Sequence, residues 1–128
     1  MTIASIDHFV LTVRSITDTC AFYERVLGMK AAEFGPGRWA LSFGSQKINL
    51  HQAGKEFEPK ARIAQPGTGD FCLISGEPLE TVIRHLEREG VAIEIGPVPK
   101  SGAAGPITSV YIRDPDDNLV EIAEYQVS

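Results

Sequence analysis

Hydrophobic and polar residues alternate along residues 6–13 with the two-residue period of a β-strand. The next stretch spaces its apolar side chains three and four positions apart and stops at Gly28, which predicts an amphipathic helix. Ser15 or Thr17 can cap the start of that helix. Short apolar runs bounded by glycine-containing turns then predict three more strands, at about 31–34, 38–43 and 47–52.

The second half of the chain repeats this order. A strand expected at 69–75 leads into a helix expected at 78–89, which stops at Gly90. The segment 96–106 is rich in Gly and Pro and is expected to be a loop. The remaining strands of this half are expected at about 91–95, 107–113 and 119–125.

The two halves also share their internal spacing. His8 precedes Gly28 by 20 residues and Asp70 precedes Gly90 by 20 residues, so the halves align at an offset of 62. The sequence therefore predicts an α+β fold of two tandem βαβββ modules, with the apolar stripes of the two helices covering one face of the sheet. At 128 residues we expect one domain, 1–128, with module 1 at about 4–53, a connector at 54–68 and module 2 at about 69–126.

The connector is polar and contains several Gly and Pro residues. It is long for a link inside a compact domain, which predicts that it lies over a site or an interface. Its charged stretch, Lys55–Arg62, has both signs of charge and is interpreted as a solvated lid or interface rather than a basic binding patch.

Composition narrows the possible partners. The formal net charge of −5 argues against nucleic acid, which requires a basic face. No apolar run is long enough to span a membrane, and the first residues show no secretory signal pattern, so a cytoplasmic location is expected. Cys20 and Cys72 are interpreted as two core thiols rather than a disulfide.

The repeat places polar residues at matching positions. His8 and Asp70 fall at the same place in the first strand of each half, and Asn49 and Glu121 fall in the last strand of each half. If the modules fold about a local twofold axis, these four positions approach one another and can form a metal pocket. For His8 the alternative is a packed polar residue on a strand face. For Asp70 the alternatives are orienting His8 from outside the ligand shell or capping the turn after Gly69.

Glu121 lies between two apolar residues, and a buried carboxylate needs a cation or strong hydrogen-bond donors. The alternative to a metal is an ion pair with Arg113 or Lys47. His51 shares a strand face with Asn49, so it can complete a ligand set or act as an acid or base; the alternative is an ordinary surface histidine. We therefore treat Glu121 and His51 as the candidate catalytic residues.

Several residues are candidates for contact with substrate. Arg113 and Tyr111 can bind an anionic group because Arg pairs well with carboxylate or phosphate. Arg38 is a weaker candidate of the same kind, and Asn49 is a polar candidate on the face it shares with His51. Ordinary strand positions are the alternative for Arg113 and Tyr111.

Three motifs together resemble the vicinal oxygen chelate superfamily, which includes glyoxalase I, fosfomycin-resistance enzymes, bleomycin-binding proteins and extradiol dioxygenases. They are Ile-Asp-His-Phe-Val-Leu-Thr-Val at 6–13, Phe-Tyr-Glu-Arg-Val-Leu-Gly-Met at 22–29 and Asp-Pro-Asp-Asp-Asn-Leu-Val-Glu-Ile at 114–122. A narrower resemblance, carried by residues 49–61 and 96–99, is to the branch around glyoxalase domain-containing protein 5 and to bacterial relatives often labelled virulence proteins.

The resemblance implies a cup-shaped mixed sheet with the helices on its convex face, and a site commonly built from modules of two chains, hence a homodimer. By position it implies one divalent metal ion, Mn, Fe, Ni or Zn, with ligand positions at His8, Asn49, Asp70 and Glu121. Asp70 stands where a His is usual and Asn49 stands where glyoxalase I has a Glu. The protein ligands expected are therefore His8 and Glu121, with Asp70 or His51 completing the set.

Two functions of different classes follow from the resemblance. One is a metal-dependent lyase or isomerase of glyoxalase-like type that acts on a small oxygen-chelating substrate, with dioxygenase chemistry as a variant. The other is a metal-free protein that sequesters a small molecule or drug, as in the bleomycin-binding branch. That branch typically lacks the metal-ligand set, whereas this chain retains His8 and Glu121.

Overall fold

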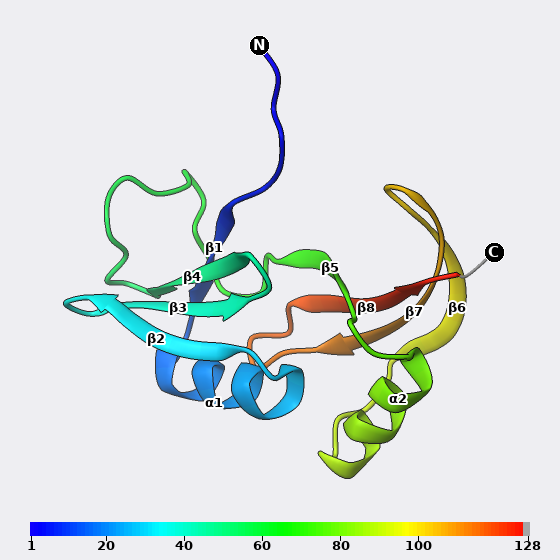
Figure 1. Cartoon of the computed structure of the whole chain (residues 1–128). Coiled ribbons are helices and arrows are strands. Elements are labelled where there is room, and N and C mark those ends of the chain that lie inside the picture. The colour runs from blue at the N-terminus through cyan, green and yellow to red at the C-terminus, as the bar shows by residue number, and fades with distance from the viewer. Residues whose placement is uncertain (127–128) are drawn as a thin grey trace. The chain divides into compact units, whose positions relative to one another are not determined.

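The computed structural model of the chain describes residues 1–126 and divides into two compact units, Met1–Thr68 and Gly69–Ser128. Each unit contains one helix and four strands in the order βαβββ (Figure 1). This order confirms the predicted fold class of two βαβββ modules. The boundary between the units follows the last residue of the expected connector, and residues 127–128 of the expected domain lie outside the described part.

The first unit forms a four-stranded mixed sheet in the order β1-β4-β3-β2, with β1 parallel to β4 and the other pairs antiparallel. The Ser15 hydroxyl caps the helix by accepting from the backbone N–H of Asp18 at 3.1 Å, and Gly28 ends it at a φ of 66°. Both helix limits confirm the sequence prediction. The elements are β1 (His8–Val13), α1 (Ile16–Leu27), β2 (Lys30–Gly35), β3 (Arg38–Phe43) and β4 (Gln46–Gln52).

Alternation along these strands separates two faces of the first sheet. One face packs against α1, where Tyr23 and Val26 are buried, and contributes the buried side chains Leu11, Val13, Leu41, Ile48 and Leu50. The opposite face, which we call the first open face, carries His8, Val10, Thr12, Arg38, Asn49 and His51.

The second unit has the matching topology, a sheet in the order β5-β8-β7-β6 with β5 parallel to β8. Its core includes Leu79 and Leu86 from α2, and the buried strand residues Ile107, Val110, Ile112, Val120 and Ile122. The face opposite this core, which we call the second open face, carries Asp70, Cys72, Ser109, Tyr111 and Glu121. The elements are β5 (Asp70–Ile74), α2 (Leu79–Arg88), β6 (Ile95–Gly102), β7 (Gly105–Arg113) and β8 (Leu119–Tyr125).

The prediction of a loop at 96–106 is wrong, because most of this segment belongs to strand β6 and the start of strand β7. The strand expected at 91–95 is also wrong, since residues 91–94 have no regular structure. Prolines are tolerated in β6 because it is an edge strand, which leaves one side of its backbone without ladder hydrogen bonds. A Cβ on Gly96 would lie 2.4 Å from the carbonyl oxygen of Ser109, so glycine permits the close approach of β6 to β7.

A buried polar turn at 114–118 fixes the start of β5. Asp114 Oδ1 accepts from the backbone N–H groups of Asp116 and Asn118 at 2.9 and 3.0 Å. The Asn118 side chain donates to Asp114 Oδ2 at 2.8 Å and accepts from the backbone N–H of Gly69 at 2.7 Å. Because Gly69 precedes Asp70, this turn sets the position of a candidate ligand.

Candidate functional site

Glu121 lies half-buried on the second open face, surrounded by hydrogen-bond donors of its own sheet. Ser109 Oγ donates to Glu121 Oε2 at 2.6 Å. Tyr111 and Cys72, its register partners on the two neighbouring strands, place a hydroxyl and a thiol beside this carboxylate. The carboxylate therefore has the strong donor that a position between Val120 and Ile122 requires.

The same carboxylate changes the acidity of its neighbours. Partial burial of the thiol, followed by the negative charge of Glu121, raises the pKa of Cys72 from 9.0 to about 11. Burial, followed by the charge of Glu121, also raises the pKa of Tyr111. Both groups are therefore protonated donors at neutral pH, and Cys72 is not a thiolate nucleophile there.

Both cysteines are free, as expected. Cys20 is buried, which agrees with its interpretation as a core thiol. Cys72 is exposed on the second open face, so its assignment to the core is wrong. The short strand β5 alternates, and Cys72 falls on its open side together with Asp70.

Arg113, a candidate for substrate contact, is held by groups of its own unit. Its Nε and Nη2 donate to the two carboxylate oxygens of Glu94 at 3.0 Å each, and its Nη1 donates to the carbonyl of Asp117 at 3.1 Å. The hydrogen bond from Arg113 is the largest cause of the lowered pKa of Glu94. Arg113 is thus paired with Glu94 rather than Glu121.

Asp70 is exposed, and its charge acts on Tyr111 and Arg113.

His8 is at the start of β1 on the first open face. Its Nδ1 lies 2.7 Å from Asp7 Oδ1, and the His8 and Asp7 side chains are 43% and 88% exposed. A carboxylate acceptor at Nδ1 assigns the ring proton to that nitrogen and leaves Nε2 as the free lone pair. This is the arrangement in which metal-binding histidines are commonly held.

His51 lies on the same open face, next to Thr12 in the parallel register, and only 8% of it is exposed. Its Nδ1 is fully enclosed and has no hydrogen-bond partner, and the same is true of Asn49 Oδ1. An enclosed polar atom without a partner costs ~1–3 kcal/mol, so each of these two atoms lowers the stability of the fold around it. His51 is therefore not an ordinary surface histidine.

The connector covers this part of the first open face. The ring of Phe57 meets His51 edge to face, with centroids 5.9 Å apart, and the Arg38 guanidinium lies 4.1 Å from the centre of the Phe57 ring. Arg38 is thereby stacked on the connector (Figure 1 shows the connector as the green loop between β4 and β5). The prediction that the connector lies over a site or an interface agrees with this placement.

A pocket of about 120 Å³ lies between the connector and the first open face. The sheet contributes the three lining residues Val10, Thr12 and His51, and the connector contributes Pro59, Lys60, Ala61, Ile63, Ala64, Gln65 and Thr68.

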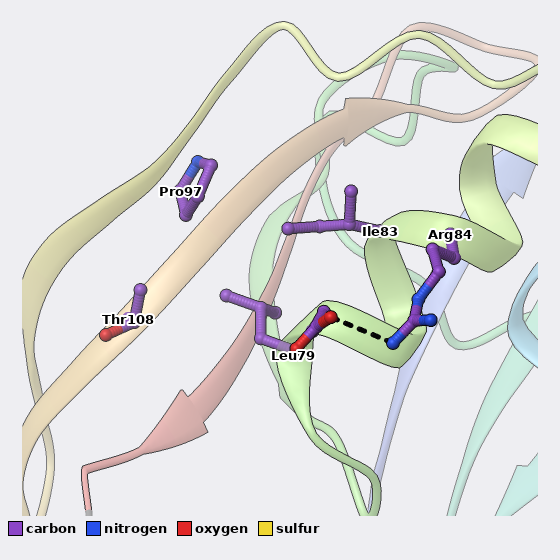
Figure 2. Close-up of a pocket in the computed structure, with 6 residues that line it drawn as sticks. Leu79, Ile83, Arg84, Pro97 and Thr108 are labelled. Atoms are coloured by element: carbon purple, nitrogen blue, oxygen red, sulfur yellow. Dashed lines mark hydrogen bonds and ion pairs between the residues drawn. The ribbon is translucent and has the colours of Figure 1, made fainter.

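A larger hollow of about 450 Å³ lies on the helix side of the second sheet (Figure 2). Leu79 and Ile83 of α2 point toward Pro97 and Thr108 on the facing strands, and the pair formed by Glu80 and Arg84 borders it. It is on the face opposite Glu121, and none of the predicted site residues lines it.

The predicted ligands fall in both units, with His8 and His51 in the first and Asp70 and Glu121 in the second. Within residues 1–126, no group of three or more His, Cys, Asp or Glu side chains gathers where it could hold a cation. Imidazole and carboxylate, the groups that His8, Asp70 and Glu121 carry, are both among the usual ligands of borderline divalent ions. Over the same residues, no helix is long and apolar enough to cross a membrane.

Comparison with known proteins identifies the family. Residues 5–122 match the model of the Glyoxalase/Bleomycin resistance protein/Dioxygenase superfamily. The chain belongs to this superfamily. The match confirms the resemblance carried by the three sequence motifs, and it covers both βαβββ modules of this glyoxalase-superfamily chain.

Two relatives match almost the whole chain. The glyoxalase domain-containing protein RDO1 of Mycosarcoma maydis is 50% identical over 98% of this chain and 71% of its own length. The virulence protein STM3117 of Salmonella typhimurium is 52% identical over 98% of this chain and 87% of its own length, and its crystal structure superposes with a TM-score of 0.97 over 98% of this chain and 100% of that one. Neither name specifies a reaction.

A more distant solved structure carries the name of an enzyme. The lactoylglutathione lyase of Agrobacterium tumefaciens is 25% identical, with a TM-score of 0.73 over 96% of this chain and 95% of that one.

The sequence did not predict that Ser109 and Cys72 of the second open face, or Phe57 of the connector, lie beside candidate site residues. Ser109 and Cys72 meet Glu121 only through strand pairing across 12 and 49 positions of sequence. Phe57 reaches His51 because the connector folds back over its own sheet. The available signal was the alternation of β7, which puts Ser109, Tyr111 and Arg113 on one face.

Proposed function

We propose that this chain is a divalent-metal-dependent lyase or isomerase of the glyoxalase type, acting on a small substrate that presents two neighbouring oxygens. His8 and Glu121 hold the metal, and Asp70 supplies a further ligand. Family membership and the 25% identity to a lactoylglutathione lyase favour this class of reaction. The observation that carries the proposal is the pairing of His8 Nδ1 with Asp7 Oδ1 at 2.7 Å, which leaves Nε2 free.

Glu121 suits the second ligand position because Ser109 holds the carboxylate in place. A carboxylate has about four lone-pair sites, so the hydrogen bond from Ser109 leaves room for a cation. Donors of this kind orient ligating carboxylates in metal sites.

Each group has a distinct part in the proposed chemistry. When bound, the divalent ion supplies Lewis-acid polarisation of the substrate oxygens. The Glu121 carboxylate is the proposed proton acceptor, and the protonated Tyr111 hydroxyl beside it can donate to an oxygen that gains charge. His51 is a second proposed acid or base on the first open face, where the connector excludes water from its ring.

Elemental analysis of protein purified without chelator tests the proposal. We expect near-stoichiometric divalent metal in the parent chain and its loss in His8→Gln and Glu121→Gln. The matched controls are His85→Gln and Glu87→Gln on α2, which should keep the metal. Asp7→Asn should weaken metal affinity by roughly 10- to 100-fold, the usual cost of losing a residue that orients a ligand. Metal retention by Glu121→Gln would contradict the assignment of this ligand.

We also propose that the chain forms a homodimer. The edge strands β1 and β5 each leave one side unpaired in the described residues. Exposed apolar side chains lie on or beside these edges: Ile3 is 79% exposed, Ile6 66%, Val10 45% and Ile74 53%. Sedimentation should give a dimer at micromolar concentration, weakened by Ile6→Asp or Ile74→Asp and unchanged by Thr17→Asp. A monomeric parent chain would overturn this.

One observation favours the alternative of a metal-free protein that sequesters a small molecule. Glu121 is only partly buried and already accepts a 2.6 Å hydrogen bond from Ser109 of its own sheet, so its burial does not by itself require a cation. Treatment with a chelator distinguishes the two functions. A sequestering protein should bind its ligand equally well before and after treatment with a chelator and show no metal-dependent rise in melting temperature.

A further inference from the structure

The pocket beneath the connector has an unusual lining for an acidic chain. Five of its side chains can donate hydrogen bonds, and they come from both walls: Thr12, His51, Lys60, Gln65 and Thr68, the last of which already donates to the Gln65 carbonyl at 3.0 Å. None of the residues described as lining it is acidic, although the whole chain has a formal charge of −5. Apolar groups such as Val10 and Ile63 complete the walls.

One of the lining residues, His51, is held rigidly in the wall and carries an enclosed nitrogen. His51 is 92% buried, by its 8% exposure, and its Nδ1 has no hydrogen-bond partner in the structure. The Phe57 ring packs edge to face against the His51 ring, and the Arg38 guanidinium covers the Phe57 ring. These contacts restrict rotation of the His51 imidazole. Lys60, the cation of the lining, has only a long contact with Glu58, at 3.7 Å.

We propose that this pocket binds a small carboxylate of two to four carbons, either as a free acid or as one end of a larger molecule. The lining supplies donors and positive charge for the carboxylate, and Val10 and Ile63 supply apolar contact for its carbon end. The volume of about 120 Å³ limits the group to a few non-hydrogen atoms. The pocket lies wholly within residues 1–68 and includes His51, so this inference rests on the proposed function at that residue but needs no bound metal.

Titration of chelator-treated protein with propionate, followed by NMR of the backbone amides and the His51 ring, tests the proposal. We expect saturable shifts at Thr12, His51 and Thr68. Propionamide, which has the same shape without the charge, should bind at least tenfold more weakly, as expected when charge-assisted hydrogen bonds are lost. Benzoate, which is too large, should also fail to produce the shifts.

Two variants locate the binding site. Lys60→Gln and His51→Gln should each raise the Kd for propionate at least fivefold. Lys55→Gln, which removes an exposed connector lysine outside the pocket, should leave the Kd unchanged. Because Lys60 is exposed in part, its variant should fold even if His51→Gln does not. The proposal is overturned if propionamide binds as well as propionate, if phosphate binds more tightly than propionate, or if Lys60→Gln has no effect.

Discussion

The hydroxyl of Ser109 donates a 2.6 Å hydrogen bond to Oε2 of Glu121 across two neighbouring strands, β7 and β8. Tyr111 and Cys72 lie beside the same carboxylate in the strand register, and burial, followed by the charge of Glu121, raises the pKa of both. The second open face therefore carries an ordered acidic group rather than an isolated buried charge. Both the metal-dependent enzyme and the metal-free binding protein would contain this fixed carboxylate, and its contribution to stability can be tested without any ligand.

Replacing Ser109 by alanine should lower the free energy of unfolding by about 1–2 kcal/mol, the net value of a hydrogen bond to a charged group that is partly exposed. Urea unfolding followed by circular dichroism measures this change. Ser101→Ala on the exposed edge strand β6 is the control and should change stability by less than about 0.5 kcal/mol. Equal effects of the two substitutions would mean that the bond to Glu121 contributes nothing measurable.

The thiol of Cys72 should titrate near pH 11 in the folded protein, because partial burial and Glu121 raise its pKa from 9.0 to about 11. Thiolate absorbance at 240 nm as a function of pH measures this, with Cys72→Ser as the blank. Glu121→Gln should lower the pKa because it removes the negative charge. A midpoint near pH 9 in the parent chain would contradict the placement of the thiol beside Glu121.

The same shift predicts a loss of stability in alkali. The folded state holds the Cys72 proton more tightly than the unfolded state does, so the stabilising contribution is complete below pH 9 and is lost as the pH rises from about 9 to about 11. The free energy of unfolding should fall more steeply over this window in the parent than in Cys72→Ser. Parallel pH profiles would show that Cys72 makes no such contribution.

Asn118→Ala should lower the free energy of unfolding by about 2–3 kcal/mol, because it leaves the Gly69 N–H and one oxygen of the buried Asp114 without their partners. Hydrogen exchange at the Asp70 amide should also become faster, since the turn fixes the start of β5. Asp117→Asn is the control: Asp117 is exposed at a φ of 64°, a conformation that asparagine tolerates. An Asn118→Ala variant as stable as the control would contradict this role of the turn.

The fold could be predicted largely from local signals. The cap at Ser15 and the stop at Gly28 set α1 as expected, and the hydrophobic alternation placed the strands to within a few residues. The error at residues 96–106 has a physical reason: prolines exclude a central strand, but they are compatible with an edge strand such as β6. Edge or central position is a property of the assembled sheet, and a single sequence does not contain it.

The candidate site was predictable only in part, for a related reason. A carboxylate between Val120 and Ile122 was expected to have a cation or strong hydrogen-bond donors, and the sequence did not identify Ser109 as the donor. The identity of that donor depends on the register between strands. The unpartnered nitrogen of His51 likewise depends on how the connector folds over β4, which no local pattern specifies.

The internal repeat extends to the side chains that hold the start of each helix. Gln52 Oε1 accepts from the Ile16 N–H at 3.3 Å while its Nε2 donates to the Arg14 carbonyl at 2.6 Å. Glu124 Oε2 accepts from the Leu79 N–H at the first residue of α2. The two residues are 72 positions apart, the same separation as Asn49 and Glu121, so the last strands of the modules are equivalent.

These equivalent residues should respond differently to exchange of amide and carboxylate. Gln52→Glu should lower the free energy of unfolding by about 1–2 kcal/mol, because a carboxylate oxygen would then face the Arg14 carbonyl that now accepts a hydrogen bond. Glu124→Gln keeps the acceptor for the Leu79 N–H and loses only the favourable charge at a helix N-terminus, worth about 0.3–1 kcal/mol. Urea unfolding of both variants, with the exposed Gln126→Glu as control, measures the difference. A larger loss in Glu124→Gln than in Gln52→Glu would contradict the assignment of Gln52 as a donor to the loop before α1.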